Sequence, residues 1–316
     1  YMFDLETNIE QLYQELVTGH YQHDGYGTYR IFDPKPRLIS KASVRDRIVH
    51  HAIHGVLGDA VDSSFIHHSY ACRKGKGTHK AVRVAQKYLR ANRYYCHLDV
   101  VQYFKNIDRE VLKGLLSRWV NDGATLELLH KIIDSSALLA NNGNLPPAER
   151  EGYRHRGLPL GNLTSQFFAN IYLNQLDQYI KHTLRIKSYM RYMDDFVIFG
   201  DSREEMATQR EKIRQFAQER LRLTLHMERA HIRRCKQGIS FLGYRIYPFY
   251  IRVLPRGVKR FRERLRVLQR DYSSGTISID QVSSSIRSPL EFFRHGNGLD
   301  IAARLLSGTT FSRSVG

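Results

Sequence analysis

Apolar positions change their spacing several times along this chain, and each change marks a predicted helix or strand. Apolar residues three and four apart predict amphipathic helices, and short apolar runs between turn residues predict strands. Helices are expected over residues 4–18, 43–61, 79–92 and 256–270, from 109 onward, from a cap at Thr164 or Ser165 onward, and from a capping box at 202–205 to Leu221. Strands are expected over residues 26–32, 37–40, 94–100, 223–225 and 239–246, and as a pair within 189–200. This order predicts an α+β fold with an antiparallel sheet backed by helices.

The length and composition of the chain are typical of a folded protein. The chain has 316 residues, 42% of them hydrophobic, which is enough to build two or three subdomains. No apolar run reaches the roughly 18 residues of a membrane span, and no signal-like segment opens the chain, so a cytoplasmic location is expected. The three cysteines are widely spaced and lie outside any CxxC pattern, which argues against a disulfide framework or a zinc site.

The net charge of the chain indicates a class of binding partner. Lys and Arg number 49 against 31 Asp and Glu, a formal net charge of +18, which suits a phosphate backbone. The segment from Arg256 to Arg270 holds seven basic residues and one acid, around an apolar stripe of Val258, Phe261, Leu265 and Leu268. One helix face would pack while the others stay cationic, and a merely solvated charged helix is the alternative.

Two adjacent carboxylates are the strongest chemical signal. Asp194 and Asp195 join two apolar runs, so the pair lies at a tight turn between hydrophobic strands. Their mutual repulsion is relieved by a divalent cation, and Mg²⁺ prefers such oxygen ligands. An in-line phosphoryl displacement uses two ions about 4 Å apart, which needs a further carboxylate. Asp99, at the end of the predicted strand 94–100, is the expected third ligand. The alternatives are an exposed hairpin turn for the pair and a turn or cap residue for Asp99.

An ordered set of motifs resembles the reverse transcriptases over nearly the whole chain. Tyr192-Met193-Asp194-Asp195 resembles their YxDD box, and Asp99 to Phe104 resembles their first palm motif. The other matches are the nucleotide-pocket motif at 157–166, the FLG-type primer grip at 241–244 and the fingers motifs at 37–39 and 46–49. The resemblance implies a right-hand polymerase with fingers over 1–93, a further helical insertion over 109–156, a palm over 94–108 and 157–248, and a helical thumb over 249–316.

The resemblance also implies roles for individual residues. Asp99, Asp194 and Asp195 are the catalytic residues and, with the Val100 carbonyl, ligands of two Mg²⁺ ions. Arg37 contacts the incoming triphosphate, assisted by Arg30 or Lys35, and Phe104 excludes a ribose 2′-OH. Further residues are implied in the nucleotide pocket (Leu160, Gly161, Gln166), the primer grip (Phe241, Leu242, Gly243) and the template–primer contact (Arg256, Lys259, Arg260).

Within the family, the chain most resembles the reverse transcriptases of diversity-generating retroelements. The features are the segments 45–52 and 69–73, Ser165-Gln166 in place of Ser-Pro, and Leu160 where many relatives have glutamine. An aliphatic Leu160 cannot donate a hydrogen bond to the nucleotide, which predicts low fidelity opposite template adenine. Arg229 stands where relatives often carry a lysine, and its high pKa makes it a poor general acid. The implied partners are template RNA, a cDNA or primer strand, dNTPs and a small basic oligomeric accessory protein.

Two other interpretations stay open. A group II intron-like or retron reverse transcriptase would use the same chemistry. A non-catalytic RNA-binding protein on a polymerase scaffold would use none of it, and Mg²⁺-dependent primer extension separates these possibilities.

Overall fold

The computed structural model of the protein describes residues 4–32, 36–141 and 145–313. They form two compact units. The first unit comprises the described residues of Tyr1–Gly75, His97–Ile198 and Glu204–His231, and the second comprises those of Lys76–Cys96, Phe199–Arg203 and Ile232–Gly316. No helix in the described ranges combines the length and the apolar character that crossing a membrane requires.

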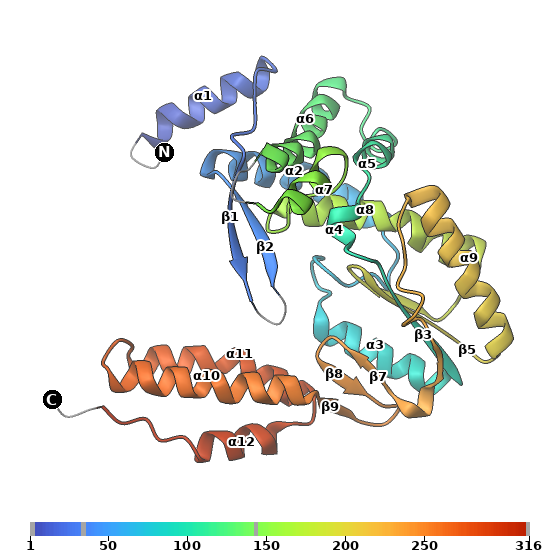
Figure 1. Ribbon diagram of the computed structural model, residues 1–316, viewed down its shortest axis with the longest axis vertical. Helices are drawn as coiled ribbons and strands as arrows, with labels where there is room; N and C mark the ends of the chain where they lie inside the picture. The colour runs from blue at the N-terminus through green and yellow to red at the C-terminus, as the bar shows by residue number, and fades with distance from the viewer. Residues whose placement is uncertain (1–3, 33–35, 142–144, 314–316) are drawn as a thin grey trace. The chain divides into compact units, whose positions relative to one another are not determined.

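The first unit is built around one buried helix, α8 (Leu163–Gln178), in which twelve of sixteen residues are buried. A helix that is apolar on all sides belongs in a core, and Figure 1 shows its neighbours gathered around it. Helix α8 contacts α2 (Val44–Ser64), α5 (Arg109–Leu116) and the π-helical turn η2 (Tyr179–Thr183). The other helices of this unit are α1 (Leu5–Val17), α4 (Tyr103–Asn106), α6 (Gly123–Asp134), the 3-10 helix η1 (Ser135–Asn141), α7 (Pro147–His155) and α9 (Arg203–Leu221).

A two-stranded hairpin extends from these helices (Figure 1). Its strands are β1 (Tyr26–Ile31) and β2 (Arg37–Ala42), paired antiparallel with Tyr26 opposite Ala42 and Ile31 opposite Arg37. The base of the hairpin is held by a hydrogen bond of 2.6 Å between the Tyr26 hydroxyl and Ser135 Oγ. Tyr26 and Leu38 also pack on the buried cluster of Leu139, Leu145 and Tyr153. The segment around η1 and α7 therefore supports the hairpin.

The remaining strands of the first unit form one side of an antiparallel sheet. In it β5 (Asp195–Gly200) lies between β4 (Tyr189–Tyr192) and the end of β3 (Tyr94–Asp99). Residues 68–70 are bound to the free edge of β4. The Arg191 N–H donates to the His68 carbonyl, and the Tyr70 N–H donates to the Arg191 carbonyl. The sheet is thus continued past β4 by main-chain contacts of residues 68–70.

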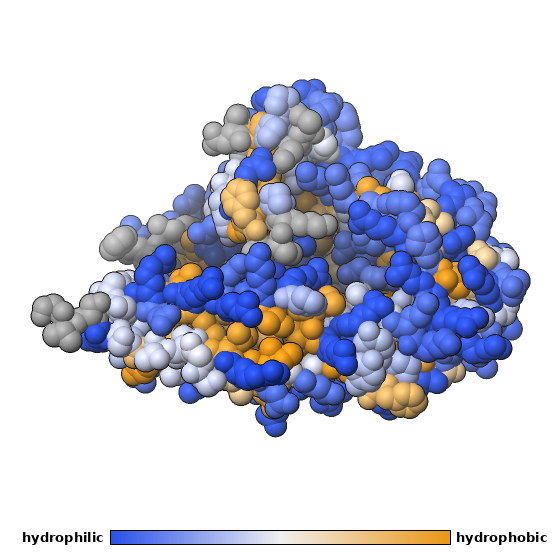
Figure 2. All heavy atoms as spheres, turned by 60° about the horizontal axis from the view of Figure 1, so that its bottom comes forward, coloured by the Kyte–Doolittle hydropathy of each residue, from blue (hydrophilic) through white to orange (hydrophobic). Residues whose placement is uncertain are grey.

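The second unit combines short strands with four α-helices and a 3-10 turn among its described residues. Its strands are the start of β3, β6 (Ile232–Arg234), β7 (Ile239–Phe241), β8 (Tyr244–Ile246) and β9 (Ile251–Val253), and its helices are α3 (Thr78–Ala91), the 3-10 turn η3 (Cys235–Gln237), α10 (Pro255–Ser273), α11 (Ile279–His295) and α12 (Leu299–Ser307). The predicted stripe of α10 is buried at Phe261, Leu265 and Leu268, against α11 and α12. Figure 2, which turns the lower side of Figure 1 forward, shows an apolar area bordered by hydrophilic side chains.

The helices expected from periodicity are confirmed within a few residues, but three local predictions are wrong. Helix α8 is capped by Asn162 and not by Thr164 or Ser165. The strand expected at 223–225 is reduced to a single bridge between Leu225 and Val100. The single strand expected over 239–246 is a hairpin, because Leu242 and Gly243 adopt φ values of +49° and +89° and reverse the chain.

Candidate active site

The Asp194-Asp195 pair lies at the tight turn of a buried hairpin. Strands β4 and β5 pair with Tyr192 opposite Asp195, so Met193 and Asp194 form the connection. Met193 has a φ of +55°, the left-handed conformation that two-residue hairpin turns require. Asp194 is therefore at the tip of the turn and Asp195 begins the next strand, as the sequence pattern predicted.

A buried arginine supports this turn through hydrogen bonds. The Arg191 side chain is fully buried, and its Nε and Nη2 donate to Asp177 of α8 at 2.7–2.9 Å. Its Nη1 donates at 3.0 Å to the Met193 carbonyl and to Asn170 Oδ1. Arg191 thus joins the turn to α8. This role was not among the sequence predictions, although a single charged residue within an apolar strand indicates that a buried partner exists.

Asp99 ends the strand that neighbours β5. Its carbonyl accepts a hydrogen bond of 2.9 Å from the His226 N–H, and the Val101 N–H donates to the Thr224 carbonyl, also at 2.9 Å. Val100, predicted as a carbonyl ligand, is buried and forms the bridge with Leu225. The segment 224–226 therefore holds the end of β3 in place.

Asp195 lies close enough to Asp194 and Asp99 to raise the pKa of each. Burial, reinforced by Asp195 and Asp99, raises the pKa of Asp194 to about 6, while Arg37 opposes the rise. Burial and Asp195 also raise the pKa of Asp99, against the cations that His226 and His97 provide when protonated. The structure thus brings Asp99 and Arg37, which are far away in sequence, within electrostatic reach of the Asp194-Asp195 pair.

Two histidines that the sequence analysis did not single out border the carboxylates. His97 Nε2 lies 3.0 Å from Asp195 Oδ1, and both side chains are about one-third exposed, at 31% and 38%. His226 contacts Glu228 through Nδ1 at 2.7 Å. His97 precedes Asp99 by two positions on β3, so both side chains point to the same face of the strand. That alternation is the sequence signal that could have identified His97.

The carboxylate oxygens of Asp99, Asp194 and Asp195 suit a hard divalent cation, although they are not already arranged around a metal position. Within the described ranges, no group of three or more His, Cys, Asp or Glu residues is arranged to hold a metal ion. Mg²⁺, however, keeps several waters and binds through one or two carboxylates together with substrate phosphates. Burial and the neighbouring carboxylates raise the pKa values of Asp99 and Asp194, and a bound cation would relieve this unfavourable charge. The three carboxylates therefore fit Mg²⁺ as a site that substrate would complete.

The loop that precedes α8 links the residues that were predicted to bind the nucleotide. The Leu158 N–H donates to the Phe104 carbonyl at 2.8 Å, and the Ser40 N–H of β2 donates to the Leu160 carbonyl at 2.7 Å. Gly161 adopts a φ of +118°, and a Cβ atom there would lie 2.7 Å from Ile39 Cγ2. Only glycine allows the loop to approach β2 this closely. Phe104, Leu160 and Gly161 thus belong to one hydrogen-bonded assembly with the hairpin.

Asn162 makes the same connection through its side chain. Its Nδ2 donates to the Ser40 carbonyl at 3.0 Å, and its Oδ1 accepts from the Ala42 N–H at 3.2 Å. These bonds explain why Asn162 precedes α8 without a side-chain cap bond. Gln166, one turn into α8, accepts at 3.1 Å from the Cys72 thiol.

The hairpin separates the two arginines predicted to act together. Arg37 is opposite Ile31, whereas Arg30 is opposite Leu38. Residues opposite each other share a face and neighbours along a strand alternate, so Arg30 and Arg37 point to opposite faces. Arg37 is the one that affects Asp194. Lys35, the alternative assistant, lies outside the described residues.

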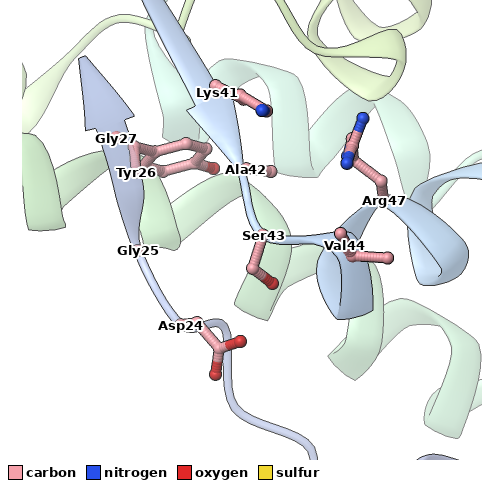
Figure 3. A pocket seen from close by; sticks show the side chains of 9 residues that line it. All are labelled: Asp24, Gly25, Tyr26, Gly27, Lys41, Ala42, Ser43, Val44 and Arg47. Carbon is pink, nitrogen blue, oxygen red and sulfur yellow. The ribbon is translucent and has the colours of Figure 1, made fainter. Parts of the chain in front are cut away.

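A pocket lies at the base of the same hairpin, lined by none of the predicted site residues. Its volume is about 430 Å³. Figure 3 shows Lys41 and Arg47 at one side of it, the Tyr26 ring between the strands, and Asp24 at the other end. Its lining comes from both strands of the hairpin and from the first turn of α2, so the pocket lies between the hairpin base and that helix.

The predicted primer-grip and thumb residues belong to the second unit. Phe241, Leu242 and Gly243 form the β7–β8 turn, where a Cβ atom on Gly243 would lie 2.9 Å from the Phe292 ring of α11. The predicted template–primer residues Arg256, Lys259 and Arg260 are exposed on α10. Their roles in nucleic-acid binding stay predictions.

The first unit's arrangement, in which a buried hairpin presents two aspartates beside a third on the adjoining strand, defines a polymerase-type fold. Comparison with known proteins then gives the family. Residues 32–246 match the model of the reverse transcriptase (RNA-dependent DNA polymerase) family, which is more than half of the chain. The chain belongs to this family.

Individual relatives agree with the family assignment. Protein YkfC of Escherichia coli is 26% identical over 283 residues, covering 77% of this chain and 72% of YkfC. The group II intron-encoded protein LtrA of Lactococcus lactis is 21% identical, covering 76% of this chain and 50% of LtrA. The telomerase structure from Candida albicans superposes with a TM-score of 0.51 at 12% identity, covering 92% of this chain and 56% of the telomerase chain. The chain therefore spans about half the length of the last two, and the telomerase likeness confirms the right-hand polymerase fold.

Proposed function

We propose that this chain is an RNA-directed DNA polymerase that extends a primer on a template RNA with dNTPs, using Asp99, Asp194 and Asp195 with two Mg²⁺ ions. The observation that carries the proposal is the electrostatic interaction of these carboxylates at the β4–β5 turn. When bound, the ions would activate the primer 3′-hydroxyl and neutralise charge on the transferred phosphoryl group. The family match and the polymerase fold support this chemistry.

The surrounding residues have binding and positioning roles in this proposal. Arg37 lowers the pKa of Asp194 and so lies within electrostatic reach of the turn, where its guanidinium suits triphosphate oxygens. Phe104, tied to Leu158 through its carbonyl, would restrict the space beside the sugar and exclude a 2′-hydroxyl. Arg191 acts on the turn and is a positioning residue.

Primer extension on a defined RNA tests the proposal. Wild type should extend a DNA primer with dNTPs and Mg²⁺, and Asp194→Asn should bind the same template–primer without extending it. Asp59→Asn, which removes an exposed carboxyl on α2, is the matched control and should extend normally. If wild type binds but never extends, the non-catalytic scaffold interpretation replaces the polymerase.

We further propose that the enzyme is error-prone at template adenines and belongs to the diversity-generating retroelement branch. Leu160 supports this, because its carbonyl is held by Ser40 while its aliphatic side chain offers no hydrogen bond to a nucleotide. The branch also implies a small basic oligomeric accessory protein as partner. Sequencing the cDNA of wild type and Leu160→Gln tests the branch, and the variant should misincorporate less at adenines.

The similarity to LtrA favours a second candidate, a group II intron-like reverse transcriptase of ordinary fidelity. In that case wild type would show no excess of errors at adenines, and Leu160→Gln would leave the error spectrum unchanged. This outcome would retain the polymerase chemistry and remove the mutagenic specialisation.

A further inference from the structure

A cluster of exposed aromatic rings and arginines covers the β8–β9 turn of the second unit. The turn is Tyr247-Pro248-Phe249-Tyr250, and the Phe249 and Tyr250 side chains are 82% and 40% exposed. An apolar ring as exposed as Phe249 contributes little to folding, because burial and not exposure gives stability. Together with Tyr250 it forms a contiguous exposed aromatic cluster, and such clusters mark interaction sites.

The turn is rigid although it is exposed. The Tyr247 N–H donates to the Tyr250 carbonyl at 2.9 Å and closes the turn. From α3, Gln86 Nε2 donates to the Tyr247 carbonyl at 3.3 Å and Arg90 Nε donates to the Pro248 carbonyl. The Arg90 guanidinium also lies 5.8 Å from the centre of the Phe249 ring. The helix therefore fixes the backbone from which Phe249 projects.

The other rings pair with arginines of the flanking strands. Tyr247 and Tyr250 stack with ring centres 4.4 Å apart and planes 24° from parallel. Arg245 of β8 lies 5.7 Å from the Tyr247 ring, and Arg252 just after the turn lies 5.1 Å from the Tyr250 ring. Each arginine is thus aligned with an aromatic face at the surface. We call Arg90, Arg245, Tyr247, Phe249, Tyr250 and Arg252 the aromatic platform.

The charge of the segments around the platform selects the kind of partner. Residues 76–96 contain six Lys and Arg and no Asp or Glu, and residues 232–262 contain nine and none. Segments with this excess of positive charge repel basic proteins and attract a phosphate backbone. Exposed rings next to arginines add a surface on which unpaired bases stack.

We propose that the aromatic platform binds single-stranded nucleic acid, with an unpaired base stacked on Phe249 and the arginines along the phosphates. Bases inside a duplex are already stacked on their neighbours, so a double helix gains only the arginine contacts. The platform is a separate site from the carboxylates, and its binding requires neither metal nor dNTPs. The proposal therefore stands or fails independently of the catalytic assignment.

Fluorescence anisotropy on the full chain tests the platform, without Mg²⁺ or dNTPs. The probes are a labelled oligouridylate of about twelve nucleotides, within the site sizes of about 4–16 nucleotides known for such surfaces, and a hairpin duplex of equal charge. Phe249→Ala should weaken binding of the single strand about tenfold and leave binding of the duplex unchanged. Phe249→Leu should behave like Phe249→Ala, because it keeps the apolar surface but loses the ring.

Matched controls separate stacking from charge. Tyr13→Ala removes a 57% exposed ring from α1, where Glu6, Glu10 and Glu15 surround it in sequence, and should not change the affinity. Asp59→Asn, which removes an exposed carboxyl on α2, should also bind the single strand normally. Arg252→Gln should weaken both probes and reduce the salt dependence of binding.

A second measurement reports stacking directly. Trp119 is the chain's single tryptophan, so Phe249→Trp combined with Trp119→Phe places the only indole on the platform. Its fluorescence should be quenched on addition of the single strand and not on addition of the duplex. Unchanged affinity of Phe249→Ala for the single strand overturns the proposal. So does an equal loss for both probes, or a change in the oligomeric state of Phe249→Ala in place of a change in affinity.

Discussion

Asp194 should make the protein less stable at neutral pH than it would be with a neutral side chain. Its pKa is raised from 3.8 to about 6, a difference of about two units, which corresponds to about 3 kcal/mol between the two protonation states. The pKa is higher in the folded than in the unfolded chain, so the folded state holds the proton more tightly. The contribution of Asp194 to stability is therefore greatest below about pH 4, falls between about pH 4 and 6, and remains lower above that range.

Asp194→Asn removes this penalty because the amide carries no charge. The variant should exceed wild type in unfolding free energy by about 2–3 kcal/mol at pH 7.5 and by much less at pH 4. Urea unfolding in the absence of divalent cations measures the difference, with Trp119 as a fluorescent reporter in the same unit. The control Asp59→Asn should show no comparable gain.

Addition of Mg²⁺ extends the test to the proposed site. A cation that binds the folded chain stabilises it by mass action, so Mg²⁺ should raise the stability of wild type more than that of Asp194→Asn. The reasoning is refuted if the variant is no more stable than wild type at pH 7.5, or if the difference between them is the same at both pH values.

Three further substitutions test the support around the site. Arg191→Met should lower the free energy of unfolding by about 3–5 kcal/mol, because Asp177 is left buried without its partner. Combining it with Asp177→Leu should recover part of that loss in urea unfolding. If the effects of the two substitutions simply add, the two side chains do not form a direct pair. Gly161→Ala should cost about 1–3 kcal/mol and lower kcat in primer extension, since its Cβ would clash with Ile39; full activity would show that the loop can shift. Ser278→Ala removes a capping box from α11 and should speed amide hydrogen exchange in the first turn of that helix, with a cost of about 1 kcal/mol in urea unfolding.

Much of the fold could be predicted because its signals are local. The apolar stripe of α10 predicts a helix, and the two apolar runs around Asp194-Asp195 predict a hairpin. Both elements occur as expected. The error over 239–246 arose because an apolar run hides a turn that needs positive φ at Leu242, a residue that rarely adopts it. Periodicity cannot reveal such a reversal.

The site was predictable where the chemistry is carried by an unusual residue pair. Asp194-Asp195 pointed to a cation site, and the need for another carboxylate pointed to Asp99. The supporting contacts could not be predicted, because they join positions far apart in sequence: Arg191 with Asp177, and Asn162 with the backbone of β2. Which partner a buried polar side chain finds depends on the packed structure and not on its neighbours in the chain.

Helix α8 has a consequence for how the hairpin and the turn are spaced. Asn162, immediately before its first residue, is bonded to β2, and Asp177, near its last, is bonded to Arg191 beneath the turn. Sixteen helical residues measure about 24 Å, and twelve of them are buried. A buried helix of fixed length thus sets the distance between the end of β2 at Ser40 and Ala42 and the arginine that supports the turn, so changes of loop length elsewhere in the unit would leave that distance unchanged.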